Sequence, residues 1–155
     1  MMQATFRSAR ADDLPAIVAM LADDTLGRTR ESPGVPLDAR YLTAFEAIDA
    51  DANQMLVIAE CEGAVVGCQQ ISFIPGLGRR GAWRALIESV RVVSNMRGHG
   101  LGQQLIGYAI AEATRRGCRM VQLTTDRSRT DAHRFYERLG FVASHVGMKL
   151  ELPQA

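Results

Sequence analysis

Hydrophobic residues recur along the chain with two different periods, and each period predicts a different kind of secondary structure. Leu14, Ile17, Val18 and Leu21 follow helical spacing, and the acidic residue Asp12 just before them is typical of a helix start. Further helices are expected over residues 38–48, 101–116 and 131–139. Strands are expected over residues 5–9, 54–60, 64–74, 83–93 and 120–124, with two more within residues 141–152 that meet near Gly147. Proline and glycine interrupt the pattern at residues 27–36 and 75–81, where loops are expected.

Short sequence signals indicate how these elements connect. Glu62 and Gly63 lie between two strand patterns, which predicts a tight hairpin. Asp38 is placed to cap the second helix. The strand–helix–strand order over residues 83–124 predicts a mixed α/β fold. Because the chain has 155 residues and no linker composition, we expect a single domain over residues 1–155.

Composition and charge disfavour several classes of binding partner and cellular location. The net charge is +1 with acids and bases interspersed, which disfavours nucleic acid, because such binders usually carry a strongly basic stripe. No apolar stretch approaches the roughly 20 residues of a membrane helix, and the N-terminus lacks the apolar core of a signal peptide. The three cysteines form no C-x-x-C pair and indicate reduced thiols in a cytoplasmic protein. No metal site is predicted.

The segment with the clearest chemistry joins a strand to a helix through Gly98, Gly100 and Gly102, with Arg97 just before them. Free N–H groups at a helix start, together with the helix dipole, favour a phosphate there. A dinucleotide fingerprint from Gly98 needs a glycine where Gln103 stands, which weakens that alternative without removing it. The segment G-x-x-x-x-G-K-[ST] is absent, which excludes a P-loop, and a plain glycine-rich connector remains an alternative.

Two motifs together carry a resemblance to a known family. The run Arg97-Gly-His-Gly100-Leu-Gly102 matches the Q/R-x-x-G-x-G/A signature of the GNAT acetyltransferases. The run Ala132-His-Arg-Phe-Tyr136-Glu-Arg-Leu-Gly-Phe141 is similar to their second landmark, A-x-x-F-Y-x-x-x-G-F. The motifs occur in the family's order and separation, so we identify the chain as resembling a small bacterial member of this family.

The resemblance implies a fold and a cofactor. The fold would have a central, mostly antiparallel sheet flanked by helices, with one splayed pair of parallel strands that holds the pantetheine arm of acetyl-CoA. Family members often carry asparagine where Arg129 stands, so the contact made there is in doubt. The implied cofactor-binding residues are Val90, Arg91, Val92, Arg97, Gly98, His99, Gly100, Leu101, Gly102, Gln103, Thr125, Arg129 and Tyr136.

The resemblance also suggests catalytic residues for acetyl transfer to an amine. Tyr136 occupies the place of the family's thiolate-facing tyrosine; the alternative is a core tyrosine beside Phe135 on an amphipathic helix. Glu88 is the candidate base, because with strict strand alternation it shares an apolar row with Leu86, Val90 and Val92. Burial would raise the pKa of such a carboxyl. The alternative is a structural ion pair, and a bulge in this strand would change the face assignment.

The acceptor amine is poorly defined by the sequence. Acidic and basic residues both occur in the N-terminal half, so charge does not choose between a cationic and an anionic acceptor. Residues expected to line an acceptor pocket are Asp24, Tyr41, Phe45 and Trp83.

The leading hypothesis is an acetyl-CoA-dependent N-acetyltransferase that acts on a primary amine by direct attack in a ternary complex. The alternative is a non-catalytic acyl-CoA-binding or regulatory module on the same fold. A DNA-binding regulator is disfavoured by the near-neutral charge and the missing helix-turn-helix pattern. Relatives often pair through C-terminal strands, so a homodimer is implied by the resemblance.

Overall fold

The computed structural model describes residues 3–154, which form two compact units that meet in sequence between Gln122 and Leu123. The second unit contains one helix, α6 (Thr130–Arg138). The elements of the first unit are, in order, β1 (Thr5–Ser8), the 3-10 turn η1 (Ala11–Asp13), α1 (Leu14–Ala22), α2 (Gly27–Arg30), α3 (Ala39–Ala50), β2 (Gln54–Cys61), β3 (Ala64–Ile74), α4 (Gly78–Gly81), β4 (Arg84–Val92), the 3-10 turn η2 (Ser94–Met96), α5 (Leu101–Arg115) and β5 (Met120–Gln122).

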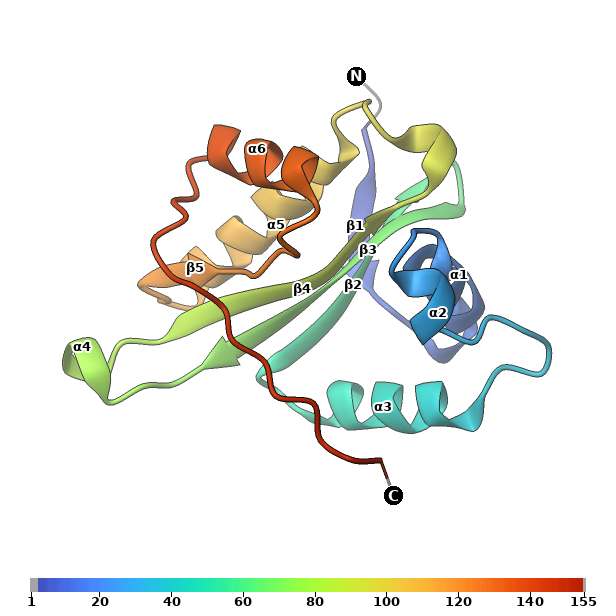
Figure 1. Ribbon diagram of the computed structural model, residues 1–155, viewed down its shortest axis with the longest axis horizontal. Coiled ribbons are helices and arrows are strands. Elements are labelled where there is room, and N and C mark those ends of the chain that lie inside the picture. Colours follow the sequence, from blue (N-terminus) through green and yellow to red (C-terminus); the bar gives the residue numbers. More distant parts are fainter. Residues whose placement is uncertain (1–2, 155) are drawn as a thin grey trace. The chain divides into compact units, whose positions relative to one another are not determined.

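The first unit is built on a five-stranded sheet in the order β1-β2-β3-β4-β5 (Figure 1). Its first four strands are antiparallel, and β5 runs parallel to β4. The register pairs Arg84 with Met120 at one end and Leu86 with Gln122 at the other. Within the described residues β5 pairs no farther than this, so the rest of β4 has an open edge. The mixed α/β fold with one splayed parallel pair is therefore confirmed.

The two faces of the sheet carry different helices. Ile58 packs with residues of α1 and α3, whereas its neighbour Ala59 packs with Leu101 and Leu105 of α5. Because successive residues of a strand point to opposite faces, α1 and α3 cover one face and α5 covers the other. Figure 1 shows this arrangement. We call these the α1/α3 face and the α5 face.

Short sequence signals predicted several turns and helix starts correctly. Glu62 and Gly63 both have positive φ, 50° and 80°, as the tightest hairpin turns require. Asp38 accepts a hydrogen bond from the N–H of Arg40 at the start of α3. At the first helical turn the carboxylate of Asp13 accepts from the N–H of Arg10 at 2.7 Å.

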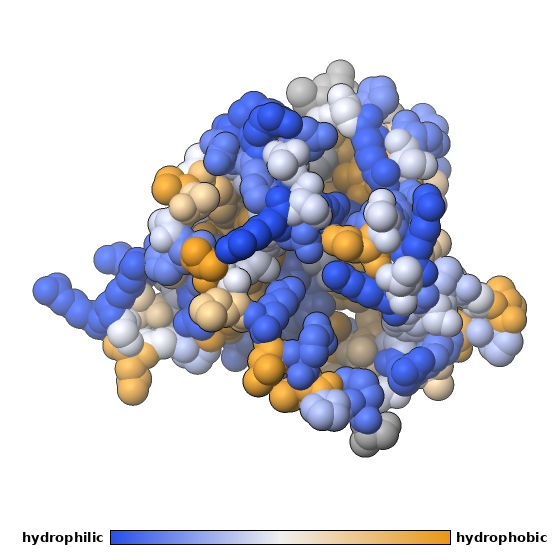
Figure 2. Space-filling model, viewed as in Figure 1, coloured by the Kyte–Doolittle hydropathy of each residue, from blue (hydrophilic) through white to orange (hydrophobic). Residues whose placement is uncertain are grey.

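The two predicted loops each contain a short helical turn, which corrects the sequence prediction. The turn α2 forms because Gly27 donates its N–H to the side chain of Asp24, and the N–H of Arg28 bonds the Asp24 carbonyl. The turn α4 lies at the tip of the β3–β4 hairpin, where Arg79 and Arg80 both adopt left-handed backbone angles. This tip protrudes and carries hydrophilic and hydrophobic atoms side by side (Figure 2).

The prediction of two strands within residues 141–152 is wrong. All of these residues are described, and none of them belongs to a strand. The alternation of Val146, Met148, Leu150 and Leu152 with polar residues fits a strand, but alternation becomes a strand only where a partner supplies backbone hydrogen bonds.

Candidate functional site

A bulge in β4 organises the candidate site. Cys68 pairs with Arg91 and Gln70 pairs with Glu88, so two residues of β4, Ser89 and Val90, lie opposite the single residue Gln69. Ser89 has a φ of 54°, a left-handed value that is rare for a residue with a side chain. The extra residue shifts the alternation of all side chains that follow it.

The predicted row of Leu86, Glu88, Val90 and Val92 is therefore divided between two faces. Val90 and Val92 pack on the α5 face. Glu88 lies opposite Gln70 and shares the α1/α3 face with Arg91, three positions later. Its side chain is exposed rather than buried, so the burial predicted for it is absent. Glu88 therefore presents its carboxylate to solvent at the edge of the bulge.

Polar side chains surround Glu88 on the α1/α3 face. Gln54 accepts hydrogen bonds through its Oε1 from the Ser72 hydroxyl at 2.8 Å and from the Gln70 amide at 3.2 Å. These residues occupy neighbouring positions of β2 and β3, and Gln70 lies directly opposite Glu88. Sequence reasoning missed them, although Gln70 and Ser72 interrupt the apolar pattern of the strand Ala64–Ile74. They form a hydrogen-bonding floor beside the candidate base.

Beyond β4 the chain makes the predicted glycine turn. Gly98 and Gly100 have φ values of 77° and 83°, and α5 begins at Leu101 directly after them. A Cβ at Gly98 would meet no atom within 4 Å, so the backbone angle rather than the space requires glycine there. The first-turn N–H groups of α5 have no partner within the helix by construction. The turn and helix start therefore suit the diphosphate of a coenzyme.

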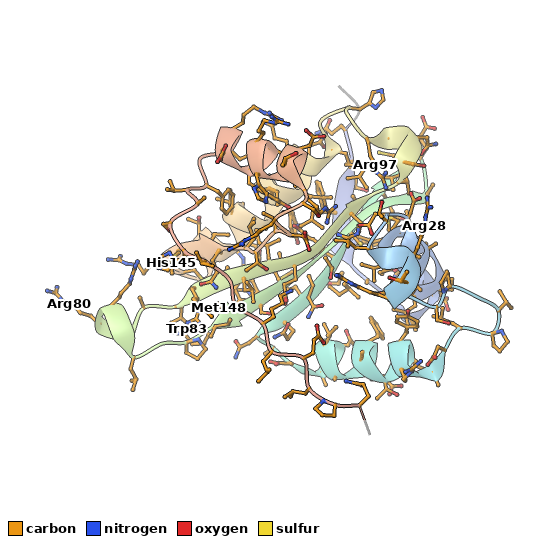
Figure 3. The ribbon with its side chains drawn as sticks, in the orientation of Figure 1. Arg28, Arg80, Trp83, Arg97, His145 and Met148 are labelled. Atoms are coloured by element: carbon orange, nitrogen blue, oxygen red, sulfur yellow. The ribbon has the colours of Figure 1, made fainter. Side chains whose placement is uncertain are left out.

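Arg97 does not turn its side chain toward these N–H groups. Its Nε donates to the carbonyl of Val92 at 3.1 Å, and its Nη2 contacts the Asp23 carboxylate at 3.0 Å and the Asp23 carbonyl at 3.2 Å. Figure 3 shows Arg97 where β4 runs into the turn before α5. Both side chains are about half exposed, at 49% and 47%. Arg97 thus joins the end of β4 to the end of α1, a contact that the sequence did not predict.

Asp24, an expected pocket residue, is held by a second arginine. Its carboxylate lies 3.4 Å from Arg91 Nη2, and both side chains are largely buried. Arg91 also donates through Nη1 to the Val90 carbonyl at 3.0 Å. The adjacent acids Asp23 and Asp24 therefore tie the α1–α2 connection to Arg91 in β4 and to Arg97 directly after η2.

The other expected pocket residues lie apart from one another. The Tyr41 hydroxyl donates to Glu31 at 2.6 Å and accepts from the N–H of Ser32, so it fastens the loop before α3. Phe45 belongs to the core of the α1/α3 face and borders a cavity of about 280 Å³. Trp83 borders a cavity of about 250 Å³ together with Phe73.

Arg116 is common to both cavities, and sequence reasoning missed it. Its guanidinium lies 3.9 Å from the ring centroid of Phe73 and donates to the Ala52 carbonyl at 2.9 Å. It also pairs with Glu112 one helical turn earlier at 3.2 Å. These contacts fix Arg116 as a wall of both cavities.

Three further cofactor or catalytic candidates, Thr125, Arg129 and Tyr136, lie in the C-terminal unit. Arg129 immediately precedes α6, and its N–H donates to the Asp126 carbonyl at 3.0 Å. Tyr136 lies on α6, with edge-to-face contacts to Phe135 and Phe141 at 5.1 and 5.8 Å between ring centroids. Thr125 lies between β5 and α6. The second motif thus builds an aromatic cluster around the tyrosine.

The described residues contain neither a membrane-spanning helix nor a cluster of metal-binding side chains. Across residues 3–154, no helix has both the length and the apolar composition to cross a membrane. In the same part of the chain, no group of three histidine, cysteine or acidic side chains is arranged to hold a metal ion.

Comparison with known proteins agrees with the motifs. The chain is 36% identical over 105 residues to an aminoalkylphosphonate N-acetyltransferase of Salmonella typhimurium, and the aligned segment covers 68% of each chain. It is 31% identical over 156 residues to an L-methionine sulfoximine/L-methionine sulfone acetyltransferase of Pseudomonas paraeruginosa, covering 96% of this chain and 88% of the relative.

A solved structure described as a transcriptional regulator from Bacillus halodurans C-125 is 49% identical. It superposes with a TM-score of 0.94 over 97% of this chain and all of that one. Residues 18–141 match the model of the acetyltransferase (GNAT) family. The match spans both motifs and most of the sheet, and the chain belongs to the GNAT acetyltransferase family.

Proposed function

We propose that the protein is an acetyl-CoA-dependent N-acetyltransferase that acylates the primary amine of a small molecule. The observation that carries this proposal is the open edge of β4, which leads directly into the glycine turn and the first turn of α5. An extended amide chain can add to such an edge as a further strand, and the diphosphate can then rest on the N–H groups of residues 98–103. Acetyl-CoA supplies the activated acetyl group as its thioester.

The chain's own residues have separate roles in this proposal. Glu88 accepts the proton that the ammonium of the acceptor loses, directly or through a water molecule. The amine nitrogen then forms a bond to the acetyl carbon and the carbon–sulfur bond breaks. The nitrogen loses a second proton to water, which in turn restores the proton that Tyr136 gives up. Tyr136 donates a proton to the departing sulfur, and an N–H of β4 near Val90 polarises the carbonyl. In this proposal the base acts from the α1/α3 face, on which Glu88 is exposed.

The acceptor we favour is a small polar amine. Two of the relatives are named for acetylation of an aminoalkylphosphonate and of L-methionine sulfoximine. Both are small amines rich in hydrogen-bonding oxygen. The floor of Gln54, Gln70 and Ser72 beside Glu88 offers amide and hydroxyl partners for such groups. A cytoplasmic location, a homodimer and a single domain stay predictions.

The test is release of free coenzyme A from acetyl-CoA with a panel of amines that includes these two substrates. Glu88→Gln should lower kcat/KM by about 10²-fold or more and remove the acidic limb of the pH profile. Tyr136→Phe should lower kcat by a similar factor. Matched controls are Glu46→Gln, an exposed acid of α3, and Tyr108→Phe, whose ring stacks on Phe6. Unchanged profiles in the first two variants would contradict the assigned roles.

A regulatory module is the second candidate, because the 49% identical structure is described as a transcriptional regulator. This candidate predicts coenzyme binding without turnover of any amine. The same panel, combined with calorimetric titration of acetyl-CoA, separates the two functions.

A further inference from the structure

Two carbonyl groups near the end of β4, those of Val90 and Val92, point toward the open edge of the sheet. The N–H of Val93 donates to the Val66 carbonyl of β3 at 2.9 Å. In a trans peptide the carbonyl of the preceding residue points the opposite way, so the Val92 carbonyl faces away from β3. The pairing of Arg91 with Cys68 gives the Val90 carbonyl the same direction. These are the acceptors that an added strand would use.

Arginine side chains already bond both carbonyls. Arg91 Nη1 bonds the Val90 carbonyl, and Arg97 Nε bonds the Val92 carbonyl. Each guanidinium is also held by an acid from the end of α1, Arg91 by Asp24 and Arg97 by Asp23. The open edge is therefore occupied by groups of the protein itself.

The two arginine–acid pairs differ in exposure. Arg91 and Asp24 are 19% and 21% exposed, whereas Arg97 and Asp23 are 49% and 47% exposed. Water and salt screen the second pair more strongly, so it is the easier one to break. A diphosphate at residues 98–103 would also lie near Arg97, which begins this turn, and a guanidinium binds phosphate oxygens with two parallel hydrogen bonds.

We propose that Asp23 opposes coenzyme binding, because it holds the Arg97 guanidinium on the Val92 carbonyl. Asp23 is thus a positioning residue that acts through Arg97. The diphosphate competes with Asp23 for Arg97, and release of Arg97 frees the Val92 carbonyl for an amide N–H of the coenzyme. The same exchange loosens the α1–α2 connection that Asp23 begins. This inference rests on the proposed coenzyme site, but it assigns a role to a residue that the proposed chemistry does not use.

Calorimetric titration with coenzyme A at fixed ionic strength tests the proposal. Asp23→Asn should lower the dissociation constant about two- to fivefold, the factor expected when an exposed ion pair no longer competes. Asp49→Asn, which makes the same charge change at an exposed position of α3, should leave it unchanged. In an Arg97→Ala background Asp23→Asn should have no effect, because its only route of action has been removed. A dissociation constant in Asp23→Asn equal to that of Asp49→Asn, or higher, overturns the proposal.

Hydrogen exchange on the unmodified protein gives a second readout that needs no variant. Addition of coenzyme A should speed exchange of the amides of residues 24–30, whereas slower or unchanged exchange there overturns the proposal. Failure of the proposed coenzyme site gives a different result, since the unmodified protein would then show no heat with coenzyme A. Urea unfolding of Asp23→Asn checks that the fold is kept.

Discussion

Gly27 offers a sharp test of the packing that holds the α1–α2 connection. The residue is buried, and a Cβ built on its backbone would lie 1.9 Å from the Leu21 carbonyl oxygen and 3.0 Å from Asp24 Oδ1. Real Cβ atoms essentially never approach a heavy atom closer than 3.0 Å. Because the nearer atom belongs to the backbone, it cannot rotate aside, and Gly27→Ala must displace the turn itself.

The magnitude follows from three contributions. Alanine in a helical position gains up to about 1 kcal/mol over glycine. Overpacking against fixed atoms costs about 1–3 kcal/mol or more, and loss of the hydrogen bond from Gly27 to Asp24 costs about 1–2 kcal/mol. We therefore expect Gly27→Ala to lower the free energy of unfolding by about 2–4 kcal/mol, given the severity of this overlap.

The matched control makes the same substitution in an open position. Gly107 lies exposed on α5, where a Cβ would meet nothing within 4 Å. Gly107→Ala should raise the free energy of unfolding by about 0.5–1 kcal/mol. Urea unfolding followed by circular dichroism measures both variants. If Gly27→Ala proved as stable as Gly107→Ala, the buried turn described here would be wrong.

Three further results are expected. Hydrogen bonds from the Arg7 guanidinium and, to a smaller extent, from the N–H of Arg10 hold the pKa of the Asp13 carboxyl below its usual value. Asp13→Asn should therefore lower the free energy of unfolding, and this loss should have its full size above about pH 4. This loss should shrink as the pH falls through the lower folded pKa, and urea unfolding that shows a constant loss down to pH 2 would refute it. Ser89→Gly should raise the free energy of unfolding by about 1 kcal/mol, because the left-handed angle of 54° strains serine; thermal unfolding that gives no gain would argue against the bulge. Burial raises the pKa of the Cys68 thiol to about 12, so iodoacetamide at pH 8 should label it only after denaturation, as peptide mass spectrometry would show.

The parts of the fold that the sequence predicted are those set by local chemistry. The Glu62-Gly63 hairpin and the Asp38 cap each depend on residues within a few positions of one another. Long apolar runs in β2 and β3 identified strands covered on both faces. The short turn α2 was missed because it depends on a side-chain bond from Asp24 and not on hydrophobic periodicity.

The contacts of the site were harder to predict because they join distant segments. Arg97 lies 74 positions from Asp23, and no local pattern indicates which acid a surface arginine will contact. The same holds for Arg116, whose guanidinium reaches the Ala52 carbonyl 64 positions away. The tail over residues 141–152 shows the opposite error, since its alternation was a local signal without the backbone partner that a strand requires.

The bulge at Ser89 explains why one strand can serve two sides of the proposed reaction. With strict alternation, Glu88, Val90 and Val92 would share a face, and the carboxylate would lie in the apolar layer under α5. One additional residue keeps Val90 and Val92 in that layer and moves Glu88 and Arg91 together onto the α1/α3 face. The strand beyond the bulge still directs the Val90 and Val92 carbonyls to the open edge. The position of the proposed base relative to the proposed coenzyme edge therefore depends on a single strained residue in β4, Ser89.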